Sequence, residues 1–280
     1  MISVVGLGNA GSRIANKFQE LPQYKVYELN DNVKRTSKYK FKLKKLETPE
    51  ECESSIPNVA KFFKEINDRV HFIVCGASFS SSYSLGILEQ IKDKQIDLIY
   101  IKPDTELLAG IPRLLENAAF GVLQEYARSG LFSSITLFSN AKIEEVIHNV
   151  PIKEYYDTLN NTVQSTLHYM NYFDHNEPEI GIFTPAAEVC RIRSYGMLDM
   201  ENLEEKWFFD LDIPREVCYY LCINQERLQN DGTLHKRYVE ILKKKPRNAF
   251  RNISYAIYET DTGRDFGFCV ARTNAVQENT

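Results

Sequence analysis

The chain has 280 residues and a mass of 32.4 kDa, which suits one large domain or two smaller ones. Hydrophobic residues make up 43% and charged residues 26%, a globular composition that excludes wholesale disorder. The formal net charge of −4 argues against a general nucleic-acid binder. No apolar run approaches the roughly 18 residues of a membrane span, and the start has no charged region typical of a signal peptide. We therefore expect a cytoplasmic protein with no membrane span and no nucleic-acid partner.

The first segment has the pattern strand, glycine turn, helix. Residues 2–5 are a β-branched run, residues 6–11 read Gly-Leu-Gly-Asn-Ala-Gly, and residues 12–18 have a helical pattern. Such a turn offers backbone N–H groups and the positive end of a helix dipole to a phosphate. Gly8 and Gly11 allow the backbone to come close to that ligand. Residues 24–29 predict a second strand.

Residues 34–45 contain seven Lys or Arg side chains in twelve positions. Tyr39, Phe41 and Leu43 alternate with lysines in this segment, which predicts an edge strand with a charged face. Charged edge strands resist aggregation, so this is the simpler interpretation. A site for an anion or a partner is the alternative.

The next hundred residues alternate between helical and strand patterns. In chain order they predict a helix at 58–68, a buried strand at 71–76, a serine-rich loop at 78–84, a helix at 85–94, a strand at 97–102, a helix at 112–129 and a strand at 134–138. Strands that alternate with helices require right-handed crossovers and a mostly parallel sheet. Residues 1–150 therefore predict a doubly wound α/β domain.

A long helix follows at residues 151–175. From Ile152 to Phe173, apolar residues recur every three or four positions over about six turns, a length that suits a helix joining two domains. Later segments predict a strand at 217–224, a helix at 234–245, a strand at 253–260 and its hairpin partner at 266–272. We expect residues 176–280 to form a smaller α+β domain.

Read in order, these segments resemble the tubulin/FtsZ superfamily of nucleotide-dependent filament formers. The similar stretches are residues 2–16 (first glycine loop and helix), 71–88 (strand, signature loop and helix), 101–103 (strand end before the ribose loop), 135–143 (strand and turn before the central helix) and 156–161 (the aromatic-x-x-x-Asn-Asp stretch that holds guanine). The resemblance covers nearly the whole chain, and its strength lies in the order and spacing of the motifs.

The resemblance implies a purine-nucleotide site with GTP or GDP, and with Mg²⁺ only if GTP binds. It places Tyr156 against the base and Asn140 and Asn160 at the base edges. The remaining implied site residues contact phosphate or ribose: Gly8, Asn9, Ala10, Gly11, Gly76, Ser80, Ser81, Ser82, Glu106 and Arg113. Asn161 stands where FtsZ commonly has Asp, which weakens the case for guanine because an amide accepts only through its oxygen.

Two departures from the family pattern bear on catalysis. The glycine-rich signature loop is replaced by residues 78–84, Ser-Phe-Ser-Ser-Ser-Tyr-Ser, where each left-handed residue costs about 1–2 kcal/mol. Counting from Asn160, the acidic catalytic loop becomes residues 181–186, which contain no carboxylate, although Thr184 and Pro185 suit a helix start. Glu177 and Glu179 lie just upstream. We expect a cytoskeletal or assembly protein that self-associates into filaments, with weak or absent GTPase activity and no assigned catalytic residue.

Two alternatives remain open. One is an NAD(P)-dependent oxidoreductase with a Rossmann domain, in which Glu28 accepts a ribose hydroxyl. The other is a monomeric, non-catalytic tubulin-like interaction module. The cysteines and histidines lack metal-ligand spacing, so we predict no metal site formed by the protein alone.

Overall fold

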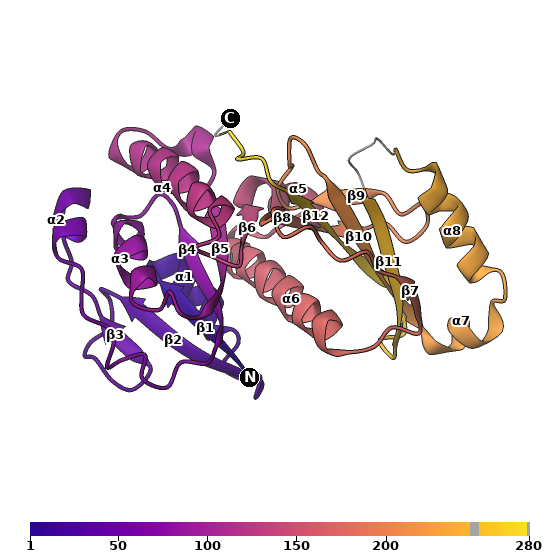
Figure 1. Ribbon diagram of the computed structural model, residues 1–280, viewed down its shortest axis with the longest axis horizontal. Helices are drawn as coiled ribbons and strands as arrows, with labels where there is room; N and C mark the ends of the chain where they lie inside the picture. The colour runs from indigo at the N-terminus through magenta and orange to yellow at the C-terminus, as the bar shows by residue number, and fades with distance from the viewer. Residues whose placement is uncertain (247–251, 279–280) are drawn as a thin grey trace.

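The computed structural model describes residues 1–246 and 252–278, and their strands form one continuous sheet along the molecule (Figure 1). The order of the described strands is β3-β2-β1-β4-β5-β6-β8-β12-β10-β11-β7, with β9 paired to β8 outside this path. Seven of the eleven described pairings are parallel. The predicted α/β fold with a mostly parallel sheet is therefore confirmed.

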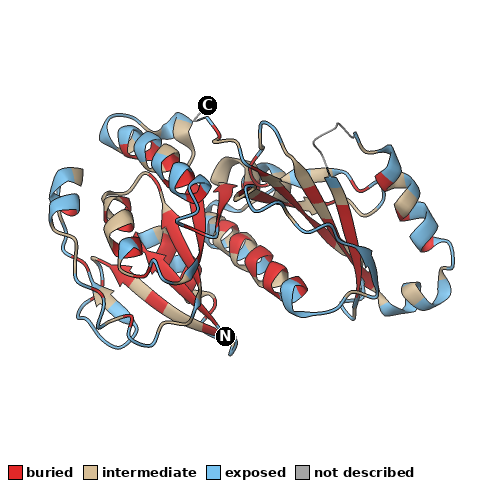
Figure 2. Ribbon diagram, in the orientation of Figure 1, coloured by how far each residue is buried: buried red, intermediate tan, exposed pale blue. Residues whose placement is uncertain are grey.

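The first half of the sheet is entirely parallel. Its strands are β1 (Ile2–Leu7), β2 (Tyr24–Asn30), β3 (Lys40–Lys42), β4 (Arg69–Cys75), β5 (Gln95–Lys102) and β6 (Ser134–Ser139). The central strands are buried along almost their whole length (Figure 2), as expected for parallel strands with helices on both faces.

Helices cover both faces of this half. They are α1 (Gly8–Asn16), α2 (Pro49–Ser54), α3 (Ser84–Glu89), α4 (Ile111–Arg128), α5 (Asn140–Ile147) and α6 (Tyr155–His175), with short 3₁₀ helices η1 (Phe79–Tyr83), η2 (Thr105–Leu107) and η3 (Ile152–Glu154). Ile14 of α1, Ile143 of α5 and Leu159 of α6 share one core cluster. Ile87 of α3 and Phe120 of α4 belong to the cluster on the other face.

The second half of the sheet is mixed. It contains β7 (Ile180–Ile182), β8 (Ile192–Leu198), β9 (Glu205–Trp207), β10 (Glu216–Asn224), β11 (Asn252–Thr260) and β12 (Phe266–Thr273), with helices α7 (Gln225–Asn230) and α8 (Leu234–Lys244). The predicted hairpin of the last two strands is wrong, because β10 lies between β11 and β12. Asp265 accepts a hydrogen bond from the Asn224 N–H, so the connection passes over the end of β10.

Helix α6 packs against both halves of the sheet. Leu159, Val163 and Phe173 are buried along it, and the Phe173 ring stacks on Tyr220 of β10 with centroids 4.7 Å apart. The helix starts at Tyr155, because η3 occupies the first residues of the predicted span. The long central helix is thus present, while the predicted domain limits at residues 150 and 175 stay a prediction.

A buried ionic network lies where the parallel strands begin. Asp97 is 3.4 Å from the guanidinium groups of both Arg69 and Arg193, and it accepts a hydrogen bond from Ser134. These cations hold the pKa of Asp97 at about 2 despite its burial. Arg69 also binds Asp174 at the end of α6 at 2.7 Å. The network therefore connects α6 to both halves of the sheet.

The predicted helix at residues 58–68 is wrong. These residues form hydrogen-bonded turns, in which the Phe63 N–H reaches the Val59 carbonyl but the Ile66 N–H stops at Phe63. Phe63 instead packs edge-on against Tyr27 with ring centroids 5.5 Å apart. The apolar residues of this segment recur because their side chains face a core, and the segment forms turns that do not extend into a helix.

The basic segment does lie at the edge of the sheet, but only Lys40–Lys42 is strand. Its outer backbone groups are already used: the Ser37 N–H donates to the Lys40 carbonyl, and the Lys42 N–H donates to the Thr36 hydroxyl. The chain therefore covers its own edge. In the described ranges, no helix has the length and apolarity that crossing a membrane requires.

Candidate functional site

A cavity of about 450 Å³ opens where β4 and β5 end and α1, α5 and α6 begin. We call it the tyrosine cavity. Its lining residues are Asn9, Ala10, Arg13, Cys75, Ile101, Pro103, Asp104, Leu107, Leu108, Asn140, Tyr155, Tyr156 and Asn160. It brings together residues from the glycine turn and from the central helix, which are about 150 positions apart in the chain. The carboxyl edge of a parallel sheet is the usual place for a ligand in such folds.

Local structure fixes the polar side chains of this cavity. Asn140 is the first residue of α5, where the Ser139 hydroxyl caps the helix by accepting from the Lys142 N–H at 3.4 Å. Tyr156 and Asn160 are four residues apart on α6 and therefore share one helix face. The Tyr156 ring is 61% exposed, so a planar ligand can reach it.

A second cavity of about 250 Å³ lies on the other side of Asn9. We call it the lysine cavity. It is lined by Asn9, Asn30, Asp31, Leu43, Lys44, Lys45, Leu46, Cys52, Ala77, Ser78, Phe79, Ser80 and Tyr83. The side-chain amides of Asn30 and Asn32 donate to the Asn9 side-chain oxygen at 3.1 and 2.9 Å. Asn9 thus borders both cavities in a fixed orientation.

The glycines of the first turn serve different purposes. Gly8 has a φ of +70°, which favours glycine, and the Ser80 hydroxyl lies directly over it. A Cβ atom at Gly8 would be 2.2 Å from that oxygen. Gly11 is buried, and a Cβ there would be 2.5 Å from the Ile73 carbonyl oxygen of β4. Gly11 therefore allows α1 to pack on the sheet and does not line either cavity.

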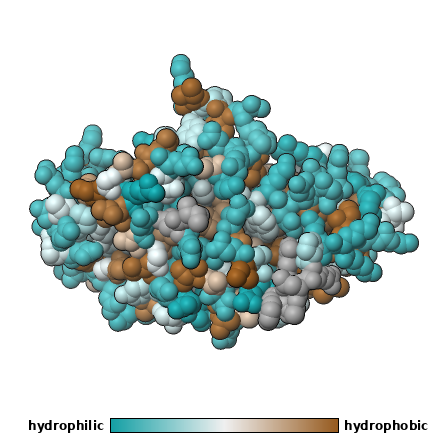
Figure 3. Space-filling model, turned by 90° about the horizontal axis from the view of Figure 1, so that it is seen from above, coloured by the Kyte–Doolittle hydropathy of each residue, from teal (hydrophilic) through white to brown (hydrophobic). Residues whose placement is uncertain are grey.

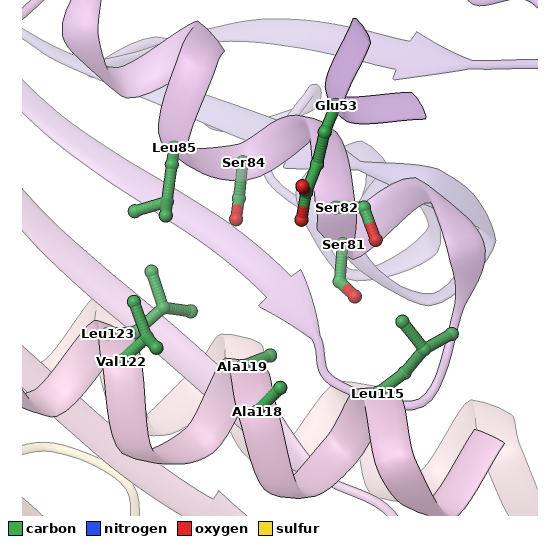
Figure 4. A pocket seen from close by; sticks show the side chains of 10 residues that line it. All are labelled: Glu53, Ser81, Ser82, Ser84, Leu85, Leu115, Ala118, Ala119, Val122 and Leu123. Carbon is green, nitrogen blue, oxygen red and sulfur yellow. The ribbon is translucent and has the colours of Figure 1, made fainter. Parts of the chain in front are cut away.

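The serine-rich segment is partly helical: it forms η1 and the start of α3. The Ser80 hydroxyl lies 2.8 Å from that of Ser78 and faces the lysine cavity. Ser81 is buried and donates to the Gly76 and Ser78 carbonyls. Figure 4 shows Ser82 beside Glu53, in a separate cavity of about 100 Å³ against α4. Of the three predicted serines, only Ser80 lines the lysine cavity.

A buried acid lies beneath this segment. A Glu116 carboxylate oxygen accepts a hydrogen bond of 2.6 Å from the Tyr100 hydroxyl, and both groups crowd the Cα of Gly76. Burial raises the pKa of Glu116 to about 7 and that of Cys75 to about 12. Gly76 therefore provides space for this acid, since any side chain there would collide with it.

Several predicted residues lie outside both cavities. Glu106 and Arg113 are exposed and are not among the described residues that line them; Asp104 occupies the loop position that does. The Asn161 amide donates to Asp157 at 3.1 Å rather than facing the cavity. Glu28, which the oxidoreductase alternative needs for ribose, forms an ion pair with Lys40 at 3.2 Å.

The sequence analysis does not assign Asn30 and Asp31 to the site, and it gives the segment of Lys44 and Lys45 as an anion site only as the alternative. Asn30 is the last residue of β2, Asp31 follows it, and the two lysines follow β3, at the same edge of the sheet as the glycine turn. The strand pattern of residues 24–29 was the available signal, because polar residues directly after a parallel strand reach this edge. In the ranges the structure describes, no group of three or more His, Cys, Asp or Glu side chains is arranged to hold a metal ion.

A sheet whose parallel half has cavities at its carboxyl edge and whose second half is mixed, together with a long central helix, defines a tubulin/FtsZ-like fold. No protein-family model and no curated protein sequence matches the chain. Several solved structures, in contrast, match the chain. The chain is similar to a GTPγS-form protofilament of TubZ from Bacillus thuringiensis serovar israelensis, with a TM-score of 0.75, 12% identity and coverage of 99% of this chain and 87% of that one.

Two other solved structures are similar in the same way. One is an empty FtsZ dimer from M. jannaschii, with a TM-score of 0.69, 13% identity and coverage of 97% and 88%. The other is a GTPγS-bound protofilament of CetZ2 from Haloferax volcanii, with a TM-score of 0.66, 9% identity and coverage of 99% and 94%. These likenesses show that the chain has the tubulin/FtsZ-like fold over nearly its whole length.

Proposed function

We propose that the chain is a tubulin/FtsZ-like cytoskeletal or assembly protein of the cytoplasm, with a degenerate guanine-nucleotide site and weak or absent GTPase activity. The observation that carries the nucleotide site is the meeting of Tyr156, Asn160 and Asn140 with the glycine turn in the tyrosine cavity. An exposed aromatic face beside amide groups suits a flat base with hydrogen-bonding edges.

Poor hydrolysis follows from the segment after α6. Residues 181–186, which the resemblance in sequence assigns to the acidic loop, contain the end of β7 and a segment without the predicted helix start at Pro185. The Thr184 N–H donates to Ser254, and Glu177 and Glu179 are exposed before the strand. No carboxylate of residues 181–186 is present to position a water molecule.

The self-assembly proposal rests on apolar side chains at two opposite edges of the sheet. At the carboxyl edge, Leu107 beside the tyrosine cavity is 82% exposed and Ile152 before α6 is 94% exposed. At the edge where β10 and β11 begin, Ile182 is 61% exposed and Val189 is 58% exposed. Thr184 and Ala187 fix this segment to Ser254 and Glu216, at the start of those strands.

Opposite edges that attract one another allow copies to stack head to tail, which produces open filaments rather than closed dimers. The face seen in Figure 3 is less suited to this, because the hydrophobic residues coloured there form small groups among hydrophilic ones. The protofilaments of the TubZ and CetZ2 structures agree with this mode of assembly.

Nucleotide binding is tested by thermal denaturation with GTP and magnesium. A ligand selective for the folded state raises the melting temperature, and Tyr156→Ala should abolish the rise. Tyr172→Ala is the matched control, because Tyr172 is a partly exposed tyrosine near the other end of α6. An unchanged melting temperature of the wild type at millimolar GTP contradicts the nucleotide site.

Assembly is tested with one charged substitution at each edge, Leu107→Glu and Ile182→Glu. Each variant alone should fail to form filaments in sedimentation and electron microscopy, because a buried unpaired carboxylate is costly at an interface. An equimolar mixture should form dimers, since each variant keeps one intact edge. Val122→Glu, at an exposed site in the middle of α4, should still assemble. A wild type that stays monomeric at every concentration would instead identify a monomeric interaction module.

A further inference from the structure

We infer that the lysine cavity is a polyphosphate site, in which Lys44 and Lys45 bind the phosphates that glycine backbone groups bind elsewhere in this fold. The inference deepens the proposed function and rests on it for the identity of the nucleotide. Its basis is the lining of the cavity: Lys44, Lys45, Ser78, Ser80 and Asn9 all border the same space of about 250 Å³.

The Gly8 region explains why a phosphate would lie in this cavity and not on the turn itself. The Ser80 hydroxyl lies 2.2 Å from where a Cβ atom on Gly8 would be, so it blocks the close approach of a phosphate oxygen to this part of the backbone. The Ser80 hydroxyl is in turn 2.8 Å from that of Ser78, so the serine pair replaces open backbone with side-chain donors. A phosphate is thereby displaced outward, toward the lysines of the next segment.

The lysines project from a fixed backbone. The side chain of Leu43 is buried, and its N–H donates to the Asn30 carbonyl at 3.0 Å, while the Tyr83 hydroxyl donates to the Lys44 carbonyl at 3.3 Å. These bonds hold the main chain of Lys44 and its neighbour Lys45 against the cavity. The ammonium groups on their flexible stems then adjust to a phosphate as point charges.

The basic residues of this segment differ in whether they form ion pairs. In the same segment Lys38 forms an ion pair with Glu65 and Lys40 with Glu28. Among the residues the structure describes, no carboxylate lies within ion-pair distance of Lys44 or Lys45. Their positive charges are therefore available to bind an anion.

Asp31 is the one carboxylate among the lining residues of this cavity. A carboxylate repels phosphate unless a cation lies between them, and Mg²⁺ is commonly held by one or two carboxylates together with substrate phosphates. Asp31 and the two lysines together give the cavity a net positive charge. The chemistry that fits is a magnesium-bound di- or triphosphate, with its base in the tyrosine cavity beyond Asn9.

The test measures binding of GTP, guanosine and inorganic tripolyphosphate by calorimetry, with magnesium, to three proteins. They are the wild type, the double variant Lys44→Gln/Lys45→Gln, and the control Lys34→Gln/Arg35→Gln, which removes the same charge from exposed positions outside the cavity. The cavity variant should lose at least about tenfold in affinity for GTP and tripolyphosphate and keep its affinity for guanosine, because charge-assisted hydrogen bonds to the phosphates are lost. The control should bind all three like the wild type.

The outcomes separate this inference from the proposed function. If the affinity for GTP and tripolyphosphate falls equally in the control and the cavity variant, or falls in neither, the lysine site is overturned, even if GTP binds. A third outcome is that tripolyphosphate binds and needs Lys44 and Lys45, while guanosine does not bind and GTP binds no more tightly than tripolyphosphate. This outcome supports the phosphate site and refutes the guanine-nucleotide function. Competition between GTP and tripolyphosphate for one site in the wild type supports both.

Discussion

The buried acid Glu116 makes stability depend on pH in a direction opposite to that of most carboxylates. Its side chain is fully buried on α4, one oxygen accepts from Tyr100, and the other has no hydrogen-bond partner among the described residues. Burial raises its pKa from the ordinary 4.5 to about 7. The neutral acid is therefore the form that suits the folded protein.

The direction and the size of this pH dependence follow from the linkage between proton binding and folding. Between these two pKa values the folded protein keeps a proton on Glu116 that the unfolded chain has released. The contribution of Glu116 to the free energy of unfolding therefore falls by about 3 kcal/mol as the pH rises from about 4.5 to about 7. Glu116→Gln has no such proton to lose. The difference in unfolding free energy between variant and wild type should grow by about 3 kcal/mol from pH 4.5 to pH 8.

Urea denaturation at several pH values measures this difference and cancels the titration of every other group. Glu125→Gln is the control on the same helix, because Glu125 is exposed and forms an ion pair with Arg128 one turn away. Its profile should run parallel to that of the wild type. Parallel profiles for Glu116→Gln and the wild type would refute the raised pKa and the neutral acid.

Four further substitutions test the packing. Asp97→Asn should cost about 3–5 kcal/mol in urea denaturation, because it removes the buried carboxylate that faces the partly buried guanidinium groups of Arg69 and Arg193. Gly11→Ala should destabilise the protein by about 1–3 kcal/mol, since its Cβ would lie 2.5 Å from a backbone oxygen of β4; Gly121→Ala, in a helix with open space around it, should stabilise it by up to about 1 kcal/mol. Phe173→Ala should lower stability by about 3–5 kcal/mol and expose the contact between α6 and β10.

The sequence predicted elements well where local signals agreed. The central helix has a continuous apolar period, and β1 is followed at once by glycines, so both were identified within a few residues. The predicted hairpin at the end of the chain is wrong because two strands that are consecutive in sequence pair only if no other strand lies between them in the sheet. Nothing in residues 261–264 indicates that β10 occupies that place.

In the candidate site too, some residues are predictable from the sequence and others depend on tertiary packing. Tyr156 and Asn160 are assigned to the site by the resemblance of residues 156–161 to a motif of the tubulin/FtsZ superfamily, and the structure places both beside Asn9 in the tyrosine cavity. The serine segment was harder, because hydroxyl direction depends on tertiary packing: Ser80 faces the cavity while Ser81 turns inward to the Gly76 carbonyl. For the lysines, the sequence leaves edge protection and an anion site as alternatives, since a charged edge strand and an anion site have the same sequence pattern.

The character of the two proposed contact edges leads to a last prediction. Where an acidic loop would present charge to the next copy, this chain presents the apolar Ile180, Ile182 and Phe183, and the opposite edge presents Leu107 and Ile152. Attraction between apolar surfaces weakens on cooling and strengthens in sulfate, whereas attraction between exposed ions weakens in any salt. Filaments should therefore dissociate when cooled toward 4 °C and persist in added ammonium sulfate, as measured by light scattering. Filaments that persist in the cold and dissolve in moderate salt would show that charge, and not burial of these side chains, joins the copies.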